Sequence, residues 1–109
     1  MEQIIVRYKV KPERVAENEE LVRAVYAELG EKGPTTFHYA TFKLADGVSF
    51  VHVSTNDADD RQSPLPELAA FERFQENIDE RCDERPIASS AVEIGSYRWI
   101  SGSAGVQSA

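Results

Sequence analysis

Cysteine and long apolar runs are scarce in this sequence. Its 109 residues include one cysteine, Cys82, which cannot form an internal disulfide and cannot by itself hold a metal ion. No apolar stretch approaches the roughly 20 residues that span a bilayer. The N-terminus has an acid at position 2 and lacks the charged-then-apolar pattern of a secretory signal. We therefore expect a soluble, cytoplasmic protein.

Basic charge is also scarce. The chain has 12 Lys and Arg residues against 19 Asp and Glu residues, which gives a formal net charge of −7. A negative protein gains little from the counterion release that drives nucleic-acid binding, and it is repelled by anionic lipid. Nucleophilic triads, phosphate-binding glycine loops and dinucleotide fingerprints are absent as well. These features argue against nucleic acid and membranes as partners.

The pattern of apolar residues predicts six elements in one domain. Residues 3–10 alternate as a strand, and residues 12–29 repeat apolar side chains at helical spacing after a proline. Residues 35–54 form a hairpin about a turn at 44–47, and a polar loop follows over 55–63. A second helix spans 63–85 and a last strand spans 87–99. We place the domain at residues 1–100 and expect a flexible tail over 101–109.

The order strand, helix, strand, strand, helix, strand is that of the ferredoxin-like α+β fold, βαββαβ. Right-handed crossovers would place both helices on one face of a four-stranded antiparallel sheet and leave the other face bare. The hairpin is apolar on both sides, with Phe37, Tyr39, Val51 and Val53 expected on one and Ala40, Phe42 and Phe50 on the other. A second copy of the sheet would cover the bare face. We therefore predict a homodimer through the sheet face, which forms a dimeric α+β barrel.

His38 and His52, the two histidines of the chain, flank the hairpin turn. If residues 45–47 form a three-residue loop with a bulge, both histidines share one face with Phe42 and Phe50. A two-residue loop would put them on opposite faces, because a one-residue slip reverses every side chain. We favour the three-residue loop.

The histidines are the best candidates for chemistry. Burial in an aromatic-lined patch would lower their pKa and favour neutral imidazoles that accept a proton, for example from a phenol. The alternative is that each is a half-buried, hydrogen-bonded residue of the sheet. Cys82 is expected to be inert core, and no metal site is expected. Tyr97 and Trp99 could stack on a ligand, form a dimer contact or join the core.

Two stretches carry a family resemblance: FVHVSTN at residues 50–56 and LPELAAFERFQENIDERC at residues 65–82. Together with the order of elements, they resemble the antibiotic-biosynthesis-monooxygenase-like group of dimeric α+β barrels over residues 3–99. The resemblance implies a pocket between the helices and the sheet, and oxidation of phenols without metal, flavin or other cofactor. His52 falls where such enzymes place an asparagine, and Asn56 where they place a tryptophan. Haem is not expected, because the second helix has no histidine to ligate iron.

Two functions are consistent with this resemblance. In the first, the chain is a cofactor-independent monooxygenase-like enzyme, an oxidoreductase whose catalytic candidates are His52 as base, His38 and Asn56. Its small phenol or quinol substrate would bind in a pocket lined by Tyr26, Phe42, Phe50, Phe71 and Phe74. In the second, the chain is a non-catalytic dimeric barrel that binds a small hydrophobic or aromatic ligand or serves in a stress response. That function needs only an apolar cavity with a few polar groups.

Overall fold

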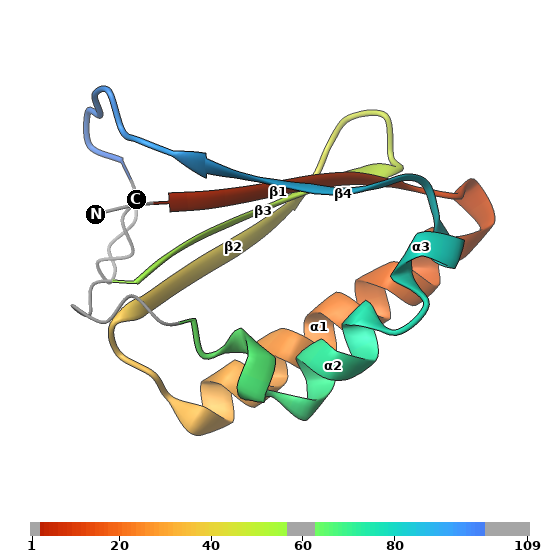
Figure 1. Ribbon diagram of the computed structural model, residues 1–109, viewed down its shortest axis with the longest axis horizontal. Helices are drawn as coiled ribbons and strands as arrows, with labels where there is room; N and C mark the ends of the chain where they lie inside the picture. The colour runs from red at the N-terminus through yellow and green to blue at the C-terminus, as the bar shows by residue number, and fades with distance from the viewer. Residues whose placement is uncertain (1–2, 57–62, 100–109) are drawn as a thin grey trace.

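The computed structural model describes residues 3–56 and 63–99. In chain order, its elements are β1 (Gln3–Val10), the 3-10 helix η1 (Pro12–Arg14), α1 (Val15–Lys32), β2 (Phe37–Lys43), β3 (Ser49–Asn56), the 3-10 helix η2 (Leu65–Glu67), α2 (Ala69–Gln75), α3 (Ile78–Arg81) and β4 (Cys82–Ala91). The strands form one antiparallel sheet in the order β2-β3-β1-β4. The helices lie on one face of the sheet, and no other described element covers the opposite face (Figure 1). The predicted ferredoxin-like α+β fold is confirmed.

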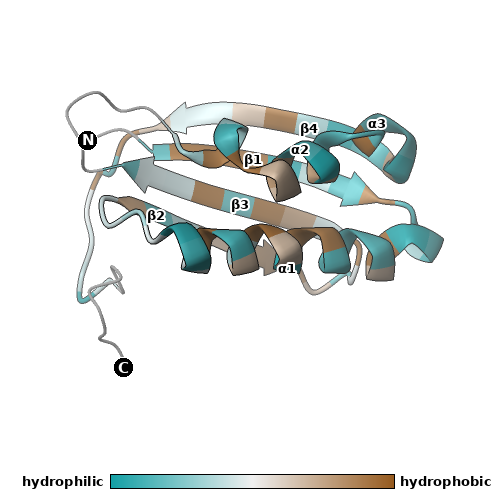
Figure 2. Ribbon diagram, turned by 90° about the horizontal axis from the view of Figure 1, so that it is seen from below, coloured by the Kyte–Doolittle hydropathy of each residue, from teal (hydrophilic) through white to brown (hydrophobic). Residues whose placement is uncertain are grey.

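The core lies between the sheet and the helices. Alternate residues of β1 point to the helix side, and Tyr8 and Val10 are buried there. Val22 and Val25 of α1 and Phe74 of α2 pack into the same cluster. Hydrophobic and hydrophilic bands alternate along the strands, as expected for a sheet with two different faces (Figure 2). The bare face is the one that remains exposed.

Helix α1 ends at a glycine, as the sequence predicts, but it continues past Gly30. Gly33 has a φ of 64°, and its N–H donates to the carbonyl oxygen of Leu29 at 2.8 Å. Glycine adopts this left-handed conformation without a steric penalty and is therefore the usual residue after a helix. The chain can then turn directly from α1 into β2.

The second helix and the last strand differ from the prediction. The helix expected over 63–85 is divided into η2, α2 and α3, and Asn77, with a φ of 58°, separates the last two. The strand expected over 87–99 begins at Cys82 and ends at Ala91. Pro86 lies within it, which is possible because β4 is an edge strand and needs no N–H on its outer side. Residues 92–99 leave the sheet (Figure 1).

The hairpin register also differs from the one we favoured. Thr41 pairs with His52 and Leu44 N–H donates to Ser49, so the loop contains four residues, 45–48, rather than three. The Asp46 carboxylate fixes this loop by accepting hydrogen bonds from the N–H groups of Val48 and Ser49 and from the Ser49 hydroxyl. The pairing is therefore shifted by one residue, which reverses the predicted faces.

The prediction that His38 and His52 share one face with Phe42 and Phe50 is wrong. His52 and Phe50 point to the helix side, whereas His38 and Phe42 point to the bare side. The grouping of the other hairpin residues changes in the same way: Phe37 and Tyr39 lie on the helix side, and Ala40, Val51 and Val53 lie on the bare side.

Two further expectations concern the ends and the solvent. In the described part of the chain, no helix has both the length and the apolar character needed to cross a membrane. The tail predicted over 101–109 lies outside the described residues, as does most of the polar loop predicted over 55–63.

Candidate functional site

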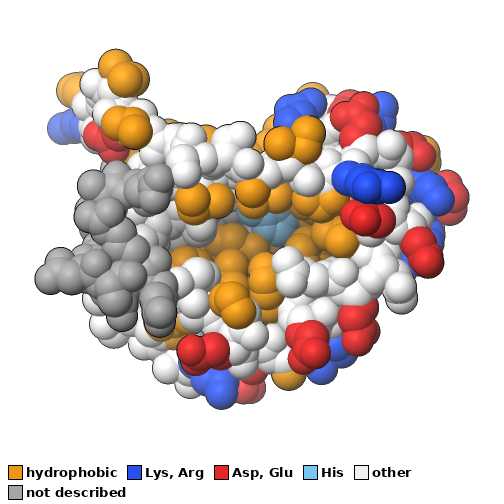
Figure 3. Space-filling view, in the orientation of Figure 1, with side chains coloured by type: hydrophobic (Ala, Val, Ile, Leu, Met, Phe, Trp, Pro, Cys, Tyr) orange, Lys and Arg blue, Asp and Glu red, His pale blue; other side chains and the backbone are white. Residues whose placement is uncertain are grey.

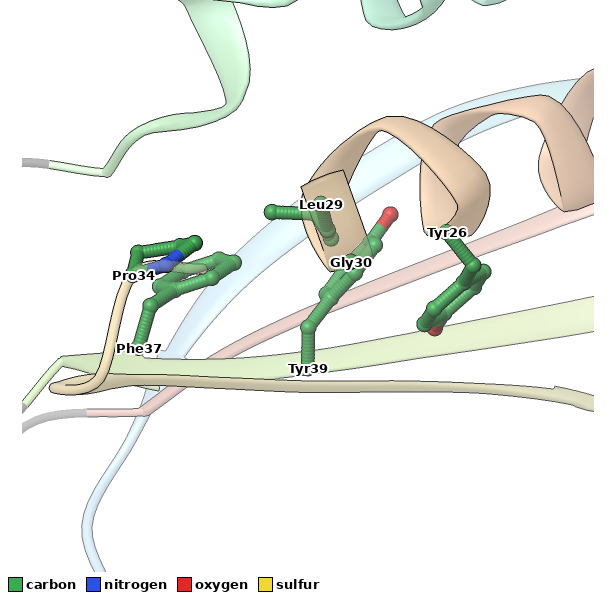
Figure 4. Close-up of a pocket in the computed structure, with 6 residues that line it drawn as sticks. All are labelled: Tyr26, Leu29, Gly30, Pro34, Phe37 and Tyr39. Carbon is green, nitrogen blue, oxygen red and sulfur yellow. The ribbon is translucent and has the colours of Figure 1, made fainter. Parts of the chain in front are cut away.

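A cavity of about 240 Å³ lies between the C-terminal half of α1 and the start of β2. Its lining consists of Tyr26, Leu29, Gly30, Pro34, Phe37 and Tyr39. Tyr26 descends from α1 and Tyr39 rises from β2, so that their rings stack with centroids 5.2 Å apart (Figure 4). Phe37 stacks on the same Tyr39 ring at 5.7 Å. The lining residues are thus mostly aromatic or apolar, and they present polar as well as apolar atoms to the cavity.

The volume of the cavity indicates the size of the group that fits inside it. An apolar cavity of about 150 Å³ holds one benzene molecule, whereas sites for drug-sized ligands occupy about 300 Å³ or more. At about 240 Å³, this cavity accommodates a single substituted ring.

His52 contacts Tyr39, one of the residues that line the cavity. Its side chain is on the helix side of β3 and is 5% exposed. Its Nδ1 lies 2.7 Å from the Tyr39 hydroxyl and 3.2 Å from Thr41 Oγ1. Thr41 Oγ1 in turn lies 2.8 Å from the Tyr26 hydroxyl. Both cavity tyrosines are therefore connected to the imidazole.

A second set of hydrogen bonds continues from the other side of the imidazole. His52 Nε2 lies 2.8 Å from the Tyr8 hydroxyl, and Asn18 Nδ2 donates to the same hydroxyl at 3.0 Å. Arg81 Nε donates to Asn18 Oδ1 at 3.1 Å. We call this connected set the polar chain; its members are Arg81, Asn18, Tyr8, His52, Tyr39, Thr41 and Tyr26.

Burial determines the protonation states along the polar chain. It lowers the pKa of His52 to about 4, so that the imidazole is neutral near pH 7. It raises the pKa of Tyr8, Tyr39 and Tyr26 above that of a free phenol, so that these side chains keep their hydrogens. Arg81 is therefore the one charged member of the polar chain.

Aromatic rings surround the imidazole of His52. The ring centroids of Tyr8, Phe74 and Tyr39 lie 5.3, 5.5 and 5.7 Å from it. In the space-filling view, a hollow opens between the helices and the sheet, lined by hydrophobic side chains, with a histidine at its floor (Figure 3). His52 is the histidine on this side of the sheet. The polar chain is thus close to a surface opening while remaining mostly buried.

Besides His52, four residues predicted for the site lie on the helix side of the sheet. Tyr26 lines the cavity, and Phe74 packs against His52. Phe71 stacks on Phe74 at 5.9 Å, and Phe50 stacks on Tyr8 at 5.5 Å. Phe50, Phe71 and Phe74 therefore pack around the polar chain and do not line the cavity.

Three other predicted residues have different positions. His38 and Phe42 lie on the bare face of the sheet, and Phe42 is 50% exposed, so neither reaches the cavity under α1. Asn56 lies at the end of β3 and pairs with Phe37, whose ring lines the cavity. Asn56 remains a candidate for contact with a ligand.

Sequence reasoning missed Asn18 and Arg81, although a signal was present. Asn18 precedes Val22 by four residues and Val25 by seven, so it occupies the apolar stripe of α1. Arg81 follows Phe74 by seven residues and Ile78 by three, which places it on the corresponding stripe. A polar residue on such a stripe is expected to be buried with a partner. Tyr8, Tyr39 and Thr41 were also missed, because strand residues of this kind usually serve the core.

The remaining candidate groups do not add a metal or a nucleophile. Within residues 3–56 and 63–99, no three or more His, Cys, Asp or Glu side chains are placed to hold a metal ion. Cys82 is buried, and burial raises the pKa of its thiol, which favours the unreactive protonated form.

No protein-family model matches the chain, and no curated protein matches it in sequence. Solved structures match it closely in shape. An antibiotic biosynthesis monooxygenase gives a TM-score of 0.67 at 17% identity, covering 87% of this chain and 100% of the other. SnoaB, a cofactor-independent oxygenase from Streptomyces nogalater, gives 0.65 at 12% identity, covering 89% and 96%. A protein of unknown function from Nitrosomonas europaea gives 0.67 at 11% identity, covering 88% and 91%.

The chain has the fold of the antibiotic biosynthesis monooxygenases. The resemblance that the sequence indicated is confirmed at the level of the fold. Because one fold supports many activities, the function of a protein with the monooxygenase fold has to be inferred from its own site.

Proposed function

We propose that the chain is a cofactor-independent monooxygenase-like protein that acts on a small phenol or quinol. The observation that carries this proposal is the polar chain, which ends in two tyrosines that line the cavity. The aromatic lining suits a flat ring, and the hydroxyls suit a phenolic oxygen. The fold shared with SnoaB, a cofactor-independent oxygenase, supports the same class of reaction.

The proposed reaction balances without a cofactor. A phenol and O2 give a quinone and one water molecule, since one oxygen atom becomes the new carbonyl and the other leaves as water. The phenol loses four electrons and O2 gains four, so no external reductant is needed. Electron transfer to O2 requires the ionised phenol. The part left to the protein is to bind the ring, exclude water and hold the ionised oxygen.

His52 would act on the ligand through Tyr39, because Tyr39 lines the cavity and is hydrogen-bonded to the imidazole, whereas His52 itself does not line the cavity. One role is the predicted one, in which the neutral imidazole accepts the phenol proton. A second role is to hold Tyr39 as a hydrogen-bond donor toward an oxygen that is already ionised. In that case the phenol proton passes to water before binding.

Oxygen uptake over a panel of phenols and quinols tests the proposal. We expect His52→Gln to lower the rate on the best substrate by about tenfold or more, since it removes the group that orients Tyr39. His38→Gln is the matched control, because it changes the other histidine on the opposite face of the sheet. Equal rates for the three proteins would remove His52 from the mechanism, and no uptake with any compound would contradict the proposal.

A ligand-binding protein without turnover is the second candidate. It is favoured by the position of His52, which does not line the cavity. Native mass spectrometry of gently purified protein separates the two functions. A retained small molecule that is unchanged after aeration supports binding alone, whereas its conversion supports an enzyme.

We also propose that a second copy of the chain covers the bare face of the sheet. Apolar side chains gather there from all strands: Ile5, Ala40, Phe42, Val51, Val53 and Ile87. Ile87 is 70% exposed. A contiguous apolar face is unfavourable in water, and two-fold dimers are the commonest soluble oligomers.

The area of the sheet indicates that residues 92–99 also take part. Four strands about 4.8 Å apart, with a rise of about 3.3 Å per residue, cover on the order of 500 Å². A standard interface buries about 800 Å² on each partner. Residues 92–99 carry four large apolar side chains that are exposed: Val92, Ile94, Tyr97 and Trp99. Ile94 is 97% exposed, and contact of this segment with the partner would supply the missing area.

A further inference from the structure

Arg81 is a buried cation held by neutral oxygen atoms. It is 1% exposed, and besides Asn18 it donates to the carbonyl oxygens of Phe74 at 2.7 Å and Glu76 at 3.3 Å. The ion pairs of the described residues do not include it. A guanidinium always carries its charge and can only donate hydrogen bonds. Any group that Arg81 contacts must therefore accept a hydrogen bond from it.

The donor and acceptor roles of Asn18 and Tyr8 follow from this contact. Because Arg81 donates to Asn18 Oδ1, the amide orientation of Asn18 is fixed and its Nδ2 group faces Tyr8. Nδ2 can only donate, so the Tyr8 oxygen accepts. The hydrogen of the Tyr8 hydroxyl is then directed to its other neighbour, His52 Nε2, at 2.8 Å.

The tautomer of His52 follows from this contact. Nε2 accepts from Tyr8 and so carries no hydrogen. Since the imidazole is neutral, its hydrogen is on Nδ1, which faces Tyr39 at 2.7 Å and Thr41 at 3.2 Å. His52 is therefore a donor toward Tyr39 and Thr41, and its lone pair, on Nε2, accepts from Tyr8.

The number of hydrogens in this part of the polar chain shows which hydrogen-bond donors remain for a ligand in the cavity. The His52 Nδ1 hydrogen and the hydroxyls of Tyr39, Thr41 and Tyr26 provide four donors. Because Nδ1 carries the hydrogen, it cannot accept, so its contacts with Tyr39 and Thr41 share that one hydrogen, and the contact between Thr41 and Tyr26 uses one hydroxyl hydrogen. Two hydroxyl hydrogens are left over: that of Tyr39, which lines the cavity, and that of either Thr41 or Tyr26.

We propose that the Arg81–Asn18–Tyr8–His52 part of the polar chain turns the tyrosine end into a hydrogen-bond donor, and that the cavity binds its aromatic ligand as an oxygen anion, a phenolate or enolate. Arg81, Asn18 and Tyr8 are positioning residues in this scheme. Their bonds polarise one another in the same direction, which strengthens the last donor. The charge of Arg81 lies at the far end of the polar chain and acts on the ligand through these bonds. This inference rests on the proposed ligand site and not on the oxidation.

The variant Asn18→Asp provides the sharpest test because it should exchange the donor and acceptor roles of Tyr8 and His52. Aspartate has the shape of asparagine but can only accept, so it would accept from both Arg81 and the Tyr8 hydroxyl. Tyr8 would then accept from His52 Nε2–H, and Nδ1 would become the lone pair facing Tyr39. Gln75→Glu, at an exposed position of α2, adds the same charge without touching the polar chain and is the control.

Nitrogen-15 NMR of the histidine side chains reads the tautomer directly. We expect the hydrogen on Nδ1 of His52 in the wild type and in Gln75→Glu, and on Nε2 in Asn18→Asp. A hydrogen on Nε2 in the wild type overturns the proposal, and this measurement does not depend on whether the variant folds. A folded Asn18→Asp protein with an unchanged tautomer also overturns it.

Binding of para-nitrophenol tests the ligand class, because its phenolate absorbs at longer wavelength than the phenol. We expect the wild type to bind the phenolate about tenfold more tightly than para-nitroanisole, the methyl ether that cannot ionise, and expect Asn18→Asp to lose this preference. Binding of the neutral phenol, or no binding at all, overturns the proposal. Phenolate binding without oxygen uptake on any substrate would end the oxygenase proposal and leave this one in place.

Discussion

His52 stays neutral over a pH range in which an exposed histidine gains a proton. Burial lowers its pKa to about 4, whereas the same side chain in the unfolded chain titrates near its ordinary value of 6.5. Between these two values the unfolded chain binds a proton that the folded protein does not bind. The contribution of His52 to the free energy of unfolding is therefore complete above about pH 6.5 and decreases as the pH falls to about 4.

We expect His52→Gln to remove this part of the pH dependence. In the wild type, the His52 contribution to the free energy of unfolding should fall by about 3 kcal/mol between about pH 6.5 and pH 4. Urea unfolding at both pH values measures the change. His38→Gln leaves His52 in place and should keep the part of the pH dependence that His52 contributes. The same slope in the wild type and in His52→Gln would contradict the assignment.

At the residue scale, the sequence could identify His52 but not its function. The two histidines stood out because the chain has no others. Whether they lie on the same face of the sheet depends on the length of the hairpin loop, which the sequence left open. The partners of His52 were less visible, since Tyr8 and Tyr39 have the composition of ordinary core residues. Asn18 and Arg81 were within reach, because each breaks the apolar stripe of its helix.

The end of α1 offers a test at the scale of an element. Gly30 lies inside the helix, and a Cβ added there would meet nothing within 4 Å, so Gly30→Ala should raise the free energy of unfolding by about 0.5–1 kcal/mol. Gly33 has a left-handed φ, so Gly33→Ala should lower it by about 1–2 kcal/mol. Urea unfolding of the two variants measures both effects. Changes of the same sign would contradict a helix that ends at Gly33.

The elements that the sequence predicted less well depend on single side chains. Loops of three and four residues both suit a turn that contains Gly47, and the Asp46 carboxylate selects the longer one through Val48 and Ser49. The second helix breaks at Asn77, whose left-handed backbone no periodicity would reveal. By contrast, β1 and α1 follow from strong alternation and helical spacing, and both were predicted within a few residues.

At the scale of the whole molecule, the fold was predictable because the order of the elements leaves few right-handed arrangements. The bare face follows from the same topology. What could not be read from the sequence was the path of residues 92–99, which continue a strand pattern of apolar residues but leave the sheet after Ala91.

The proposed dimer predicts the effect of a charge on the bare face. Ile87 is exposed, so Ile87→Glu should leave the folding of a single copy nearly unchanged and should disrupt a contact between two copies. Light scattering at micromolar concentration should show a dimer for the wild type and a monomer for Ile87→Glu. Ala27→Glu adds the same charge to the exposed side of α1 and should remain dimeric. A monomeric wild type would contradict the proposed dimer.

The polar chain takes its members from β1, α1, β2, β3 and α3, segments that lie far apart in the sequence. If any one of these segments is displaced, buried donors and acceptors lose their partners at a cost of about 1–3 kcal/mol each. Incomplete assemblies are therefore penalised several times over, and the five segments should fold and unfold together. Amide hydrogen exchange would then slow in concert across all of them when the cavity is occupied, although an occupant touches only α1 and the neighbouring strand.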